Sequence, residues 1–289
     1  MDRDKLEQLI GEKLTGESSV GGGCIADSRI ISTETGQKYF LKQGFSNGMF
    51  LSEANGLREL DRAKAIRVPK VIDAGEDYLI MEHIGQGPRK AGFFQEFGQQ
   101  FARLHQFAGS EFGFYEDNFI GSTPQKNIPS GEEARDWGKF YWNKRLMFQF
   151  RLAEENGYAD KQLRRLFQSL ENEYDKILEG SAEPPALLHG DLWGGNYMSD
   201  ENGDPVLIDP AVYYGHREAD LAMTKLFGGF TSEFYKAYHE TYPLNEGVEK
   251  REPLYLLYHV LNHMNLFGAG YYSQSIRLLE KLTKQTRSD

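Results

Sequence analysis

The chain has 289 residues, including 19 Phe and 16 Tyr, and carries a formal net charge of −10 at pH 7. Its length suits one large domain or two packed lobes, and its aromatic content can build a sizeable core, which argues against intrinsic disorder. The acidic balance argues against a nucleic-acid binder, which would need a basic surface, but a few local cations suffice to bind one nucleotide.

The N-terminal residues predict a short helix, because Leu6, Leu9, Ile10 and Leu14 share one helical face. This segment lacks the unbroken apolar region of a signal peptide, and no stretch of the chain has the length of a membrane span. Cys24 is the only cysteine, so no intramolecular disulfide can form. We therefore expect a cytoplasmic protein that does not contact a membrane.

Strands dominate the pattern between this helix and residue 84. Gly21, Gly22 and Gly23 predict a turn between two strands. Further strands are predicted over residues 38–42, 71–72 and 78–81. Between the first two of these, helical spacing of apolar residues predicts a helix that contains Phe50, Glu53, Ala54, Leu57 and Leu60.

Helices dominate the remainder of the chain, after a connector indicated by Gly85, Gly87 and Pro88. Helices are predicted around Phe94, Phe97, Phe101 and Leu104, and over residues 132–155 and 160–179. Residues 186–188 lead into a glycine-rich loop, residues 206–208 form a short apolar strand, and the rest is largely helical. This order predicts a small strand-rich lobe joined to a larger helical lobe, with a nucleotide cleft between them.

The strongest chemical signal is the motif HGDLWGGN at residues 189–196, followed by Asp209 after an apolar strand. A phosphotransferase needs a carboxylate to accept the proton of the substrate hydroxyl, and oxygen ligands for Mg²⁺. Asp191 can serve as that base. Asn196 matches the spacing of the kinase catalytic loop, and Asp209 takes the place of the metal-binding Asp of kinases. Each residue alone also fits an ordinary turn or strand end, but together they favour a kinase that uses ATP and Mg²⁺.

Residues upstream of the motif agree with an ATP-binding lobe. Gly21, Gly22 and Gly23 lie where a phosphate-covering loop belongs, although a plain hairpin turn also explains them. Lys42 would reach the α- and β-phosphates, and Glu53, eleven residues later on a helix, would pair with Lys42 and orient it. The simpler alternative for both charges is a solvated surface position.

The end of the last N-terminal strand resembles the hinge that meets adenine in kinases. There, next to Met81, the backbone of Glu82 and Ile84 would contact the adenine ring, and a strand end that enters a loop is the alternative. Together with the catalytic motif, these elements predict an α+β, bilobal protein-kinase-like fold. Its ATP-binding lobe would comprise residues 1–84, and its catalytic and substrate-binding lobe residues 85–289.

Three polar residues after the motif allow different roles. His216 and Glu218 either touch the substrate or belong to a solvated turn. Asp220 is expected to hold the backbone of the catalytic loop by hydrogen bonds rather than to act as a second base.

Hydrogen-bonded packing roles are expected for His105, His259 and His263. The last two have the i, i+4 spacing of some metal ligands.

Five segments resemble signature segments of the fructosamine (ketosamine) 3-kinase family, and the resemblance extends over nearly the whole chain. They are GGGCI at 21–25, DNFIGSTPQKN at 117–127, HGDLWGGN at 189–196, IDPAVYYGHREADLAM at 208–223 and LNHMNLFGAGYY at 261–272. Choline kinases and aminoglycoside phosphotransferases share the HGD…N skeleton but usually lack a Trp at the position of Trp193. Protein kinases have Arg in place of Gly190 and Phe in place of Pro210.

The resemblance implies transfer of the γ-phosphoryl group of ATP to the 3-hydroxyl of a fructosamine or ketosamine, which leads to deglycation of amines or proteins. The ketosamine could be a small molecule or protein-bound, and Trp193 is a candidate substrate contact. One alternative is a kinase for another small alcohol, such as choline or an aminoglycoside. A non-catalytic ATP-binding scaffold is disfavoured, because Lys42, Asp191, Asn196 and Asp209 are all present.

Cys24 directly follows the three glycines and would lie near Lys42, which favours its reactive thiolate form. Since the chain has no second cysteine, oxidation would give a dimer through Cys24 or a mixed disulfide, and either would slow catalysis. The protein is therefore expected to be a monomer, or a dimer through Cys24 under oxidising conditions. An inert packing role for this thiol is the alternative.

Overall fold

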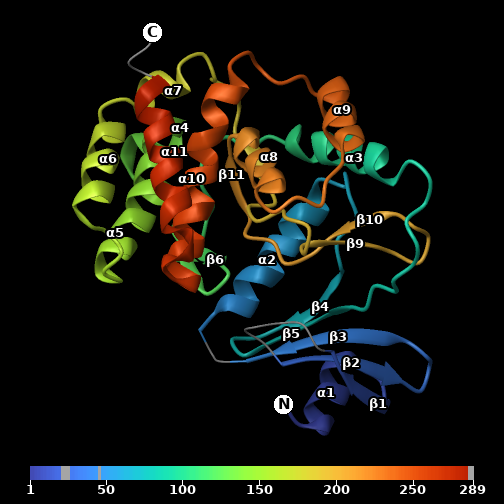
Figure 1. Ribbon diagram of the computed structural model, residues 1–289. Helices are drawn as coiled ribbons and strands as arrows, with labels where there is room; N and C mark the ends of the chain where they lie inside the picture. The colour runs from blue at the N-terminus through green and yellow to red at the C-terminus, as the bar shows by residue number, and fades with distance from the viewer. Residues whose placement is uncertain (21–26, 45–46, 286–289) are drawn as a thin grey trace.

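The computed structural model describes residues 1–20, 27–44 and 47–285 of the chain. Within these ranges, five antiparallel strands form one sheet, in the order β1-β2-β3-β5-β4. The elements of this part are α1 (Arg3–Ile10), β1 (Leu14–Ser19), β2 (Asp27–Thr33), β3 (Lys38–Gln43), α2 (Met49–Arg62), β4 (Val71–Ala74) and β5 (Tyr78–Glu82). In Figure 1 the sheet lies below the helices of the rest of the chain, and α2 stands between them.

The two faces of this sheet contribute residues to different cores, since alternate residues of a strand point to opposite faces. On one face, Ile31 and Leu41 pack with Leu6 of α1 in a small core. On the other face, Leu79 and Met81 belong to the main core, which includes the buried side of α2. The sheet is thereby attached to the helical part through α2.

The N-terminal helix is shorter than its apolar pattern predicts. Asp2 caps it by accepting a hydrogen bond from the backbone N–H of Lys5, and Gly11, with a φ of 79°, ends it. Leu14, which we expected on the helical face, begins β1 and is buried in the same core as Leu6.

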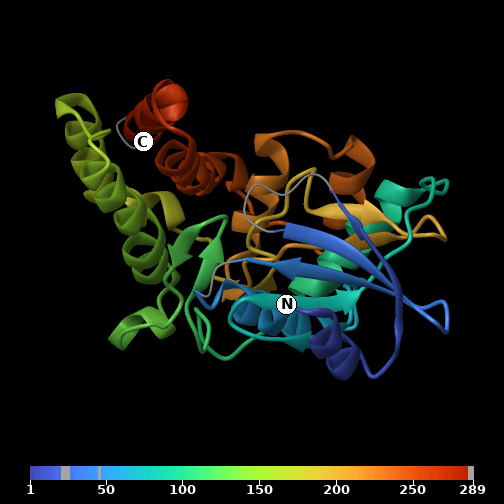
Figure 2. The ribbon, with the colours of Figure 1, turned by 90° about the horizontal axis from the view of Figure 1, so that it is seen from below.

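The described residues after β5 form helices and three two-stranded sheets. The elements are α3 (Phe93–His105), β6 (Asn118–Ile120), β7 (Thr123–Gln125), η1 (Gly131–Ala134), α4 (Trp137–Tyr141), η2 (Trp142–Leu146), α5 (Met147–Glu155), α6 (Lys161–Glu171), α7 (Tyr174–Leu178), β8 (Ala186–Leu188), β9 (Tyr197–Ser199), β10 (Pro205–Leu207), β11 (Tyr213–Gly215), α8 (Arg217–Leu226), α9 (Ser232–Thr241), α10 (Val248–Phe267), η3 (Ala269–Tyr271) and α11 (Tyr272–Gln285). Figures 1 and 2 place α5 and α6 at one side, away from the five-stranded sheet. Among the described helices, none is long and apolar enough to cross a membrane.

Two of the small sheets position the loops that carry the catalytic motif. β8 pairs with β11 and β9 pairs with β10, both in antiparallel fashion. Residues 189–196 connect β8 to β9, and residues 208–212 connect β10 to β11. The two loops meet, because the backbone N–H of Ala211 donates to the backbone O of His189 at 2.8 Å. We did not predict β6, β7, β8, β9 or β11, since strands of three residues show too little periodicity.

Candidate active site

Lys42 lies between two carboxylates where the sheet meets the helical part. Its Nζ is 2.7 Å from Oε1 of Glu53 on α2 and 2.6 Å from Oδ1 of Asp209, in the loop after β10. Burial alone would lower the pKa of Lys42, but the negative charges of Glu53 and Asp209 outweigh burial and raise that pKa. Lys42 is therefore a protonated cation that connects the two parts of the chain.

Asp191 and Asn196 are hydrogen-bonded to each other within the loop after β8. Nδ2 of Asn196 donates to the backbone O of Asp191 at 2.8 Å and to its Oδ2 at 3.1 Å. Burial raises the pKa of Asp191 well above its ordinary value. The hydrogen bond from Asn196 opposes this shift, and the charges of Asp209 and Asp220 add to it. The amide thus orients a carboxyl group with raised proton affinity, as a general base requires.

Buried hydrogen bonds hold this loop to α8. Asp220 accepts from the backbone N–H of His189 at 2.7 Å and of Gly190 at 2.8 Å, and Nε2 of His105 lies 3.2 Å from its Oδ2. Gly190 has a φ of 83°, and a Cβ there would lie 2.0 Å from the backbone O of Ala211, so a side chain does not fit. Asp220 and His105 therefore have the structural roles that we expected.

Asn196 and Asp209 provide oxygen atoms suited to a divalent cation. Asp209 has a φ of 53°, a left-handed conformation that residues other than glycine rarely adopt and that often occurs at functional sites. Its side chain is 47% exposed. Since Nδ2 of Asn196 donates to Asp191, its amide oxygen can face a cation. One carboxylate and one amide oxygen fit Mg²⁺, which takes its other ligands from phosphate and water.

At the end of β5, the two residues whose backbone is predicted to contact adenine differ in their hydrogen bonding. The backbone N–H of Glu82 donates to the backbone O of Lys70 at 2.8 Å, which continues the pairing of β5. Within the described ranges, the backbone N–H of Ile84 makes no hydrogen bond. Such a donor could meet adenine, while the side chain of Met81 is 5% exposed and belongs to the main core. The adenine contact of these residues stays a prediction.

The glycines Gly21, Gly22 and Gly23 and the adjacent Cys24 lie outside the described residues. Their proposed roles, in covering the phosphates and in redox sensitivity, therefore stay predictions. The strands β1 and β2 on either side pair with each other up to Ser19, which lies opposite Arg29.

Trp193 belongs to an exposed aromatic surface beside the catalytic loop. It is 39% exposed, its ring lies over Gly195, and it packs edge-on against Phe227 with ring centroids 6.0 Å apart. The ring of Phe227 lies 4.7 Å from that of His263 on α10. Nδ1 of His263 donates to the backbone O of His259 at 2.8 Å, in agreement with the expected packing role. This apolar surface extends from the catalytic loop to α10.

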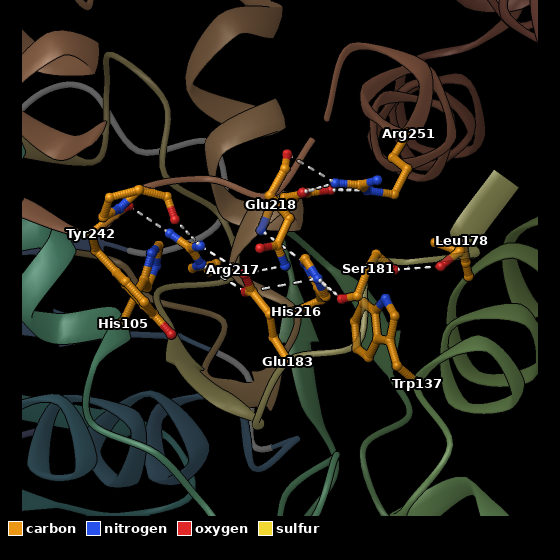
Figure 3. A network of polar contacts seen from close by, with 12 residues as sticks. His105, Trp137, Leu178, Ser181, Glu183, His216, Arg217, Glu218, Tyr242 and Arg251 are labelled. Atoms are coloured by element: carbon orange, nitrogen blue, oxygen red, sulfur yellow. Dashed lines mark hydrogen bonds and ion pairs between the residues drawn. The ribbon is translucent and has the colours of Figure 1, made fainter. Parts of the chain in front are cut away.

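His216 and Glu218 lie in a buried polar network that Figure 3 shows. Nε2 of His216 donates to the backbone O of Ser181 at 2.7 Å, and Glu218 accepts two hydrogen bonds from Arg251, at 2.8 and 2.6 Å. His216 and Glu218 are only 1% and 2% exposed. A substrate would have to break these pairs to reach them. The structure therefore gives both residues a packing role in place of the substrate contact that we considered.

A cavity of about 490 Å³ lies between α8, α9 and the start of α10. Glu218 is part of its lining, but Lys42, Asp191, Asn196 and Asp209 are not. The residues predicted to carry the chemistry therefore lie apart from this cavity, at the junction of the sheet and the helical part.

Sequence reasoning missed a set of buried amide side chains that supports the backbone after β10. Nε2 of Gln125 donates to the backbone O of Ala211 at 3.0 Å, and Nδ2 of Asn118 donates to that of Val212 at 2.8 Å. Both amides come from the β6–β7 hairpin and are at most 4% exposed. The density of amide residues in the segment 117–127 was an available signal, which we used only for the family resemblance.

Comparison with known proteins covers the whole length of the chain. The family model described as fructosamine kinase matches residues 3–285. A chloroplastic protein-ribulosamine 3-kinase of Oryza sativa subsp. indica is 41% identical, and the match covers 100% of this chain and 86% of the relative. A ketosamine-3-kinase of Mus musculus is 34% identical, with 94% of this chain and 96% of the relative covered.

Solved structures agree with the predicted fold class. A candidate fructosamine-3-kinase from Thermobifida fusca has a TM-score of 0.88 at 31% identity, and the match covers 98% of both chains. An aminoglycoside phosphotransferase has a TM-score of 0.65 at 15% identity, with 98% of this chain covered, a likeness of fold alone. The α+β, bilobal protein-kinase-like fold is thereby confirmed.

Proposed function

The chain belongs to the fructosamine kinase family, and on this premise we propose that it transfers the γ-phosphoryl group of ATP to the 3-hydroxyl group of a ketosamine. The observation that carries this proposal is the ion pair of Lys42 with Asp209, two residues that lie 167 positions apart. It brings a cation at the sheet next to the loops that hold Asp191 and Asn196. This supports one site in which Lys42 would bind phosphate, Asp191 would act as the base, and Asn196 and Asp209 would hold the metal ion.

Asp191 would accept the proton of the substrate hydroxyl as its oxygen attacks the γ-phosphorus. The hydrogen bond from Asn196 to Oδ2, at 3.1 Å, keeps this carboxylate in one orientation. Because its pKa is raised, this carboxylate binds the proton more tightly than an ordinary aspartate would. Positioned bases of this kind commonly contribute about 10²- to 10⁴-fold to the rate.

Lys42 would contact the phosphates, because Glu53 holds its ammonium group in place. Asn196 and Asp209 are the residues that would hold Mg²⁺. The bound ion would neutralise charge on the phosphates during transfer. The backbone of Glu82 and Ile84 would hold the adenine ring.

The names of the relatives support a ketosamine as the acceptor, since they specify ribulosamine and ketosamine 3-kinases. Trp193 offers an exposed ring two residues from Asp191, where the carbon chain of the sugar could pack. Phosphorylation at this position would lead to deglycation of the amine, whether it is a small molecule or a protein side chain. A cytoplasmic location suits the single cysteine.

The test is an ATP-consumption assay of the purified protein with a panel of acceptors. We expect Mg²⁺-dependent turnover with synthetic fructosamine, ribulosamine or both, and none with choline or an aminoglycoside. Turnover with choline or an aminoglycoside alone would establish a kinase for another alcohol. ATP binding without turnover on any acceptor would indicate a non-catalytic scaffold. Non-reducing electrophoresis in the same series would show whether the active form is a monomer and whether oxidation links it through Cys24.

A further inference from the structure

Arg67 connects the end of β5 to the hairpin formed by β9 and β10. Its Nη2 donates to Oε1 of Glu82 at 2.7 Å, and its Nη1 donates to Oδ2 of Asp200 and lies 3.4 Å from Oε1 of Glu201. The backbone O of Arg67 accepts a hydrogen bond from the backbone N–H of Leu207 at 3.0 Å. Arg67 thus binds the hairpin through its side chain and its backbone, and binds the predicted hinge through its side chain.

The carboxylate partners of Arg67 are themselves held in place. Asp200 is 2% exposed, and its Oδ1 accepts from two backbone N–H groups of the hairpin turn, both at 2.9 Å. Oε2 of Glu82 accepts from the backbone N–H of Lys70 at 3.2 Å. Because a planar guanidinium group binds carboxylates in defined directions, Arg67 fixes Glu82 and Asp200 relative to each other.

The opposite end of this hairpin carries the proposed metal ligands. Asn196 directly precedes β9, and Asp209 follows β10 after one residue. The backbone N–H of Ile208 donates to the backbone O of Asn196 at 3.1 Å, which closes that end of the hairpin. Asn196 and Asp200 are four residues apart, or about 13 Å in an extended chain. A displacement of the turn would therefore be transmitted along a short hydrogen-bonded unit to the ligands.

The connector after the hinge also lies against the turn. The backbone N–H of Gly87 donates to the backbone O of Ser199 at 3.3 Å. A Cβ on Gly87 would lie 2.7 Å from the backbone O of Asp200, so the two segments approach too closely for a side chain. The hinge, its connector and the hairpin thus form one packed unit. Arg67 is the charged link between the hinge and this turn, and Lys90, after the connector, pairs with Asp204 of the turn.

We propose that Arg67 is a positioning residue of the phosphoryl transfer. It sets the distance and angle between the backbone that meets adenine and the residues that hold Mg²⁺ at the phosphates. This inference rests on the proposed function, since it takes the ATP-binding roles of Glu82, Asn196 and Asp209 from it. ATP is held at both ends, so a shift of one end relative to the other weakens its binding and misplaces the γ-phosphate.

The variant Arg67→Met keeps the length of the side chain and removes its charged hydrogen bonds. We expect about a tenfold rise in KM for ATP and in the Mg²⁺ concentration for half-maximal activity, a change equivalent to losing one charged contact. KM for the ketosamine should change less than about twofold, because the proposed acceptor contact Trp193 lies neither at the hinge nor in the turn of the hairpin. Arg67→Lys, which can keep one of the pairs, should lie between Arg67→Met and the wild type.

Two further variants separate positioning from folding. Asp200→Asn keeps an acceptor for the turn but removes the charge that faces Arg67, so it should raise KM for ATP in the same way. Combined with Arg67→Met, it should add less than its single effect, because both act on one interaction. Arg164→Met is the matched control, since Arg164 pairs with Glu154 within the helical part, and it should leave both nucleotide parameters unchanged.

Equilibrium titration of MgATP without acceptor accompanies the kinetics, so that the two proposals can fail separately. If the protein does not phosphorylate ketosamines but Arg67→Met binds MgATP more weakly than the wild type, the positioning role of Arg67 is supported and the ketosamine is refuted as the acceptor. Ketosamine phosphorylation with wild-type KM for ATP in Arg67→Met would overturn the role of Arg67. A lower kcat with unchanged KM for ATP and unchanged Mg²⁺ requirement would also overturn it. If Arg67→Met does not fold, the same measurements on Asp200→Asn support or overturn the role of Arg67 by the same criteria.

Discussion

Two clusters of paired charges in this molecule have similar residues but different surroundings. At the junction of the sheet and the helices, Lys42 pairs with Glu53 and Asp209, and the side chain of Asp209 is 47% exposed. Near the start of α8, Glu218 pairs with Arg251, and both side chains are at most 3% exposed. Solvent, and therefore a ligand, can reach Asp209 in the first cluster. The two side chains of the second cluster are almost fully buried and paired with each other, although Glu218 also lines the cavity between α8, α9 and α10.

The difference indicates which charges can act on a ligand. Lys42 occupies one oxygen of Asp209, whose backbone is also held in a left-handed conformation. Both carboxylate oxygens of Glu218, in contrast, accept hydrogen bonds from Arg251. Strained backbone conformations are common at functional sites, whereas removing one partner of a buried ion pair strongly destabilises the folded protein. Changes in the first cluster should therefore affect rates, and changes in the second should affect stability.

The largest expected effect is on the rate, in the variant Asp191→Asn. This variant changes the proposed base, whose carboxyl group interacts with the charge of Asp209 in the first cluster. The amide cannot accept the hydroxyl proton, so kcat should fall by about 10²- to 10⁴-fold, while the dissociation constant of MgATP changes little. Steady-state kinetics and equilibrium binding measure the two quantities on one preparation. Wild-type kcat in this variant would show that Asp191 is not the base.

The buried pair should respond to Arg251→Ala with a loss of stability. The variant leaves Glu218 as a buried charge without Arg251, which typically costs about 3–5 kcal/mol in the free energy of unfolding. Urea unfolding measures this loss. Adding Glu218→Gln should restore part of the stability, because it removes the uncompensated charge. A stable Arg251→Ala protein with a strongly reduced kcat would contradict the division between the two clusters.

A smaller, selective effect is expected for Trp193→Ala, in the loop that also carries Asp191. Loss of the exposed ring should raise KM for the ketosamine by about tenfold, equivalent to about 1.4 kcal/mol of packing, with KM for ATP unchanged. Tyr115→Ala removes a ring that is 66% exposed and is the control. An unchanged KM for the ketosamine would exclude Trp193 from the acceptor site.

The smallest effect concerns His259, a buried residue of α10. Burial, together with the nearby His263, lowers the pKa of His259 from its ordinary value of 6.5 to about 3. Between these values the unfolded chain binds a proton that the folded chain does not, so stability falls as the pH drops below about 6.5. At pH 6, protonation of His259 in the unfolded chain should lower the free energy of unfolding by about 1 kcal/mol.

The variant His259→Gln, which cannot titrate, isolates this contribution. Its free energy of unfolding should decline less steeply than that of the wild type between pH 7 and pH 5. Urea unfolding at several pH values gives both slopes. Identical slopes would mean that His259 is protonated as readily in the folded chain as in the unfolded chain.

The sequence predicts local features of the site well and its long-range support poorly. The spacing of Asp191, Asn196 and Asp209 is readable because these residues lie in two short loops around one hairpin. The fold class follows from the change from strands to helices after residue 84. The burial of His216 and Glu218 could not be read, because the start of a helix looks alike whether solvent or protein covers it. Arg67 carries no local signal, since its partner Asp200 lies 133 residues away.

The position of the phosphate in the product tests most directly whether the accessible charge cluster performs phosphoryl transfer to a ketosamine. The protein is incubated with ATP, Mg²⁺ and a fructosamine, and the product is examined by phosphorus–proton correlation NMR. We predict a phosphorus signal coupled to the proton on carbon 3 of the sugar, and no such signal from Asp191→Asn in the same time. Phosphate on another carbon, or ATP hydrolysis without a phosphorylated sugar, would contradict the account.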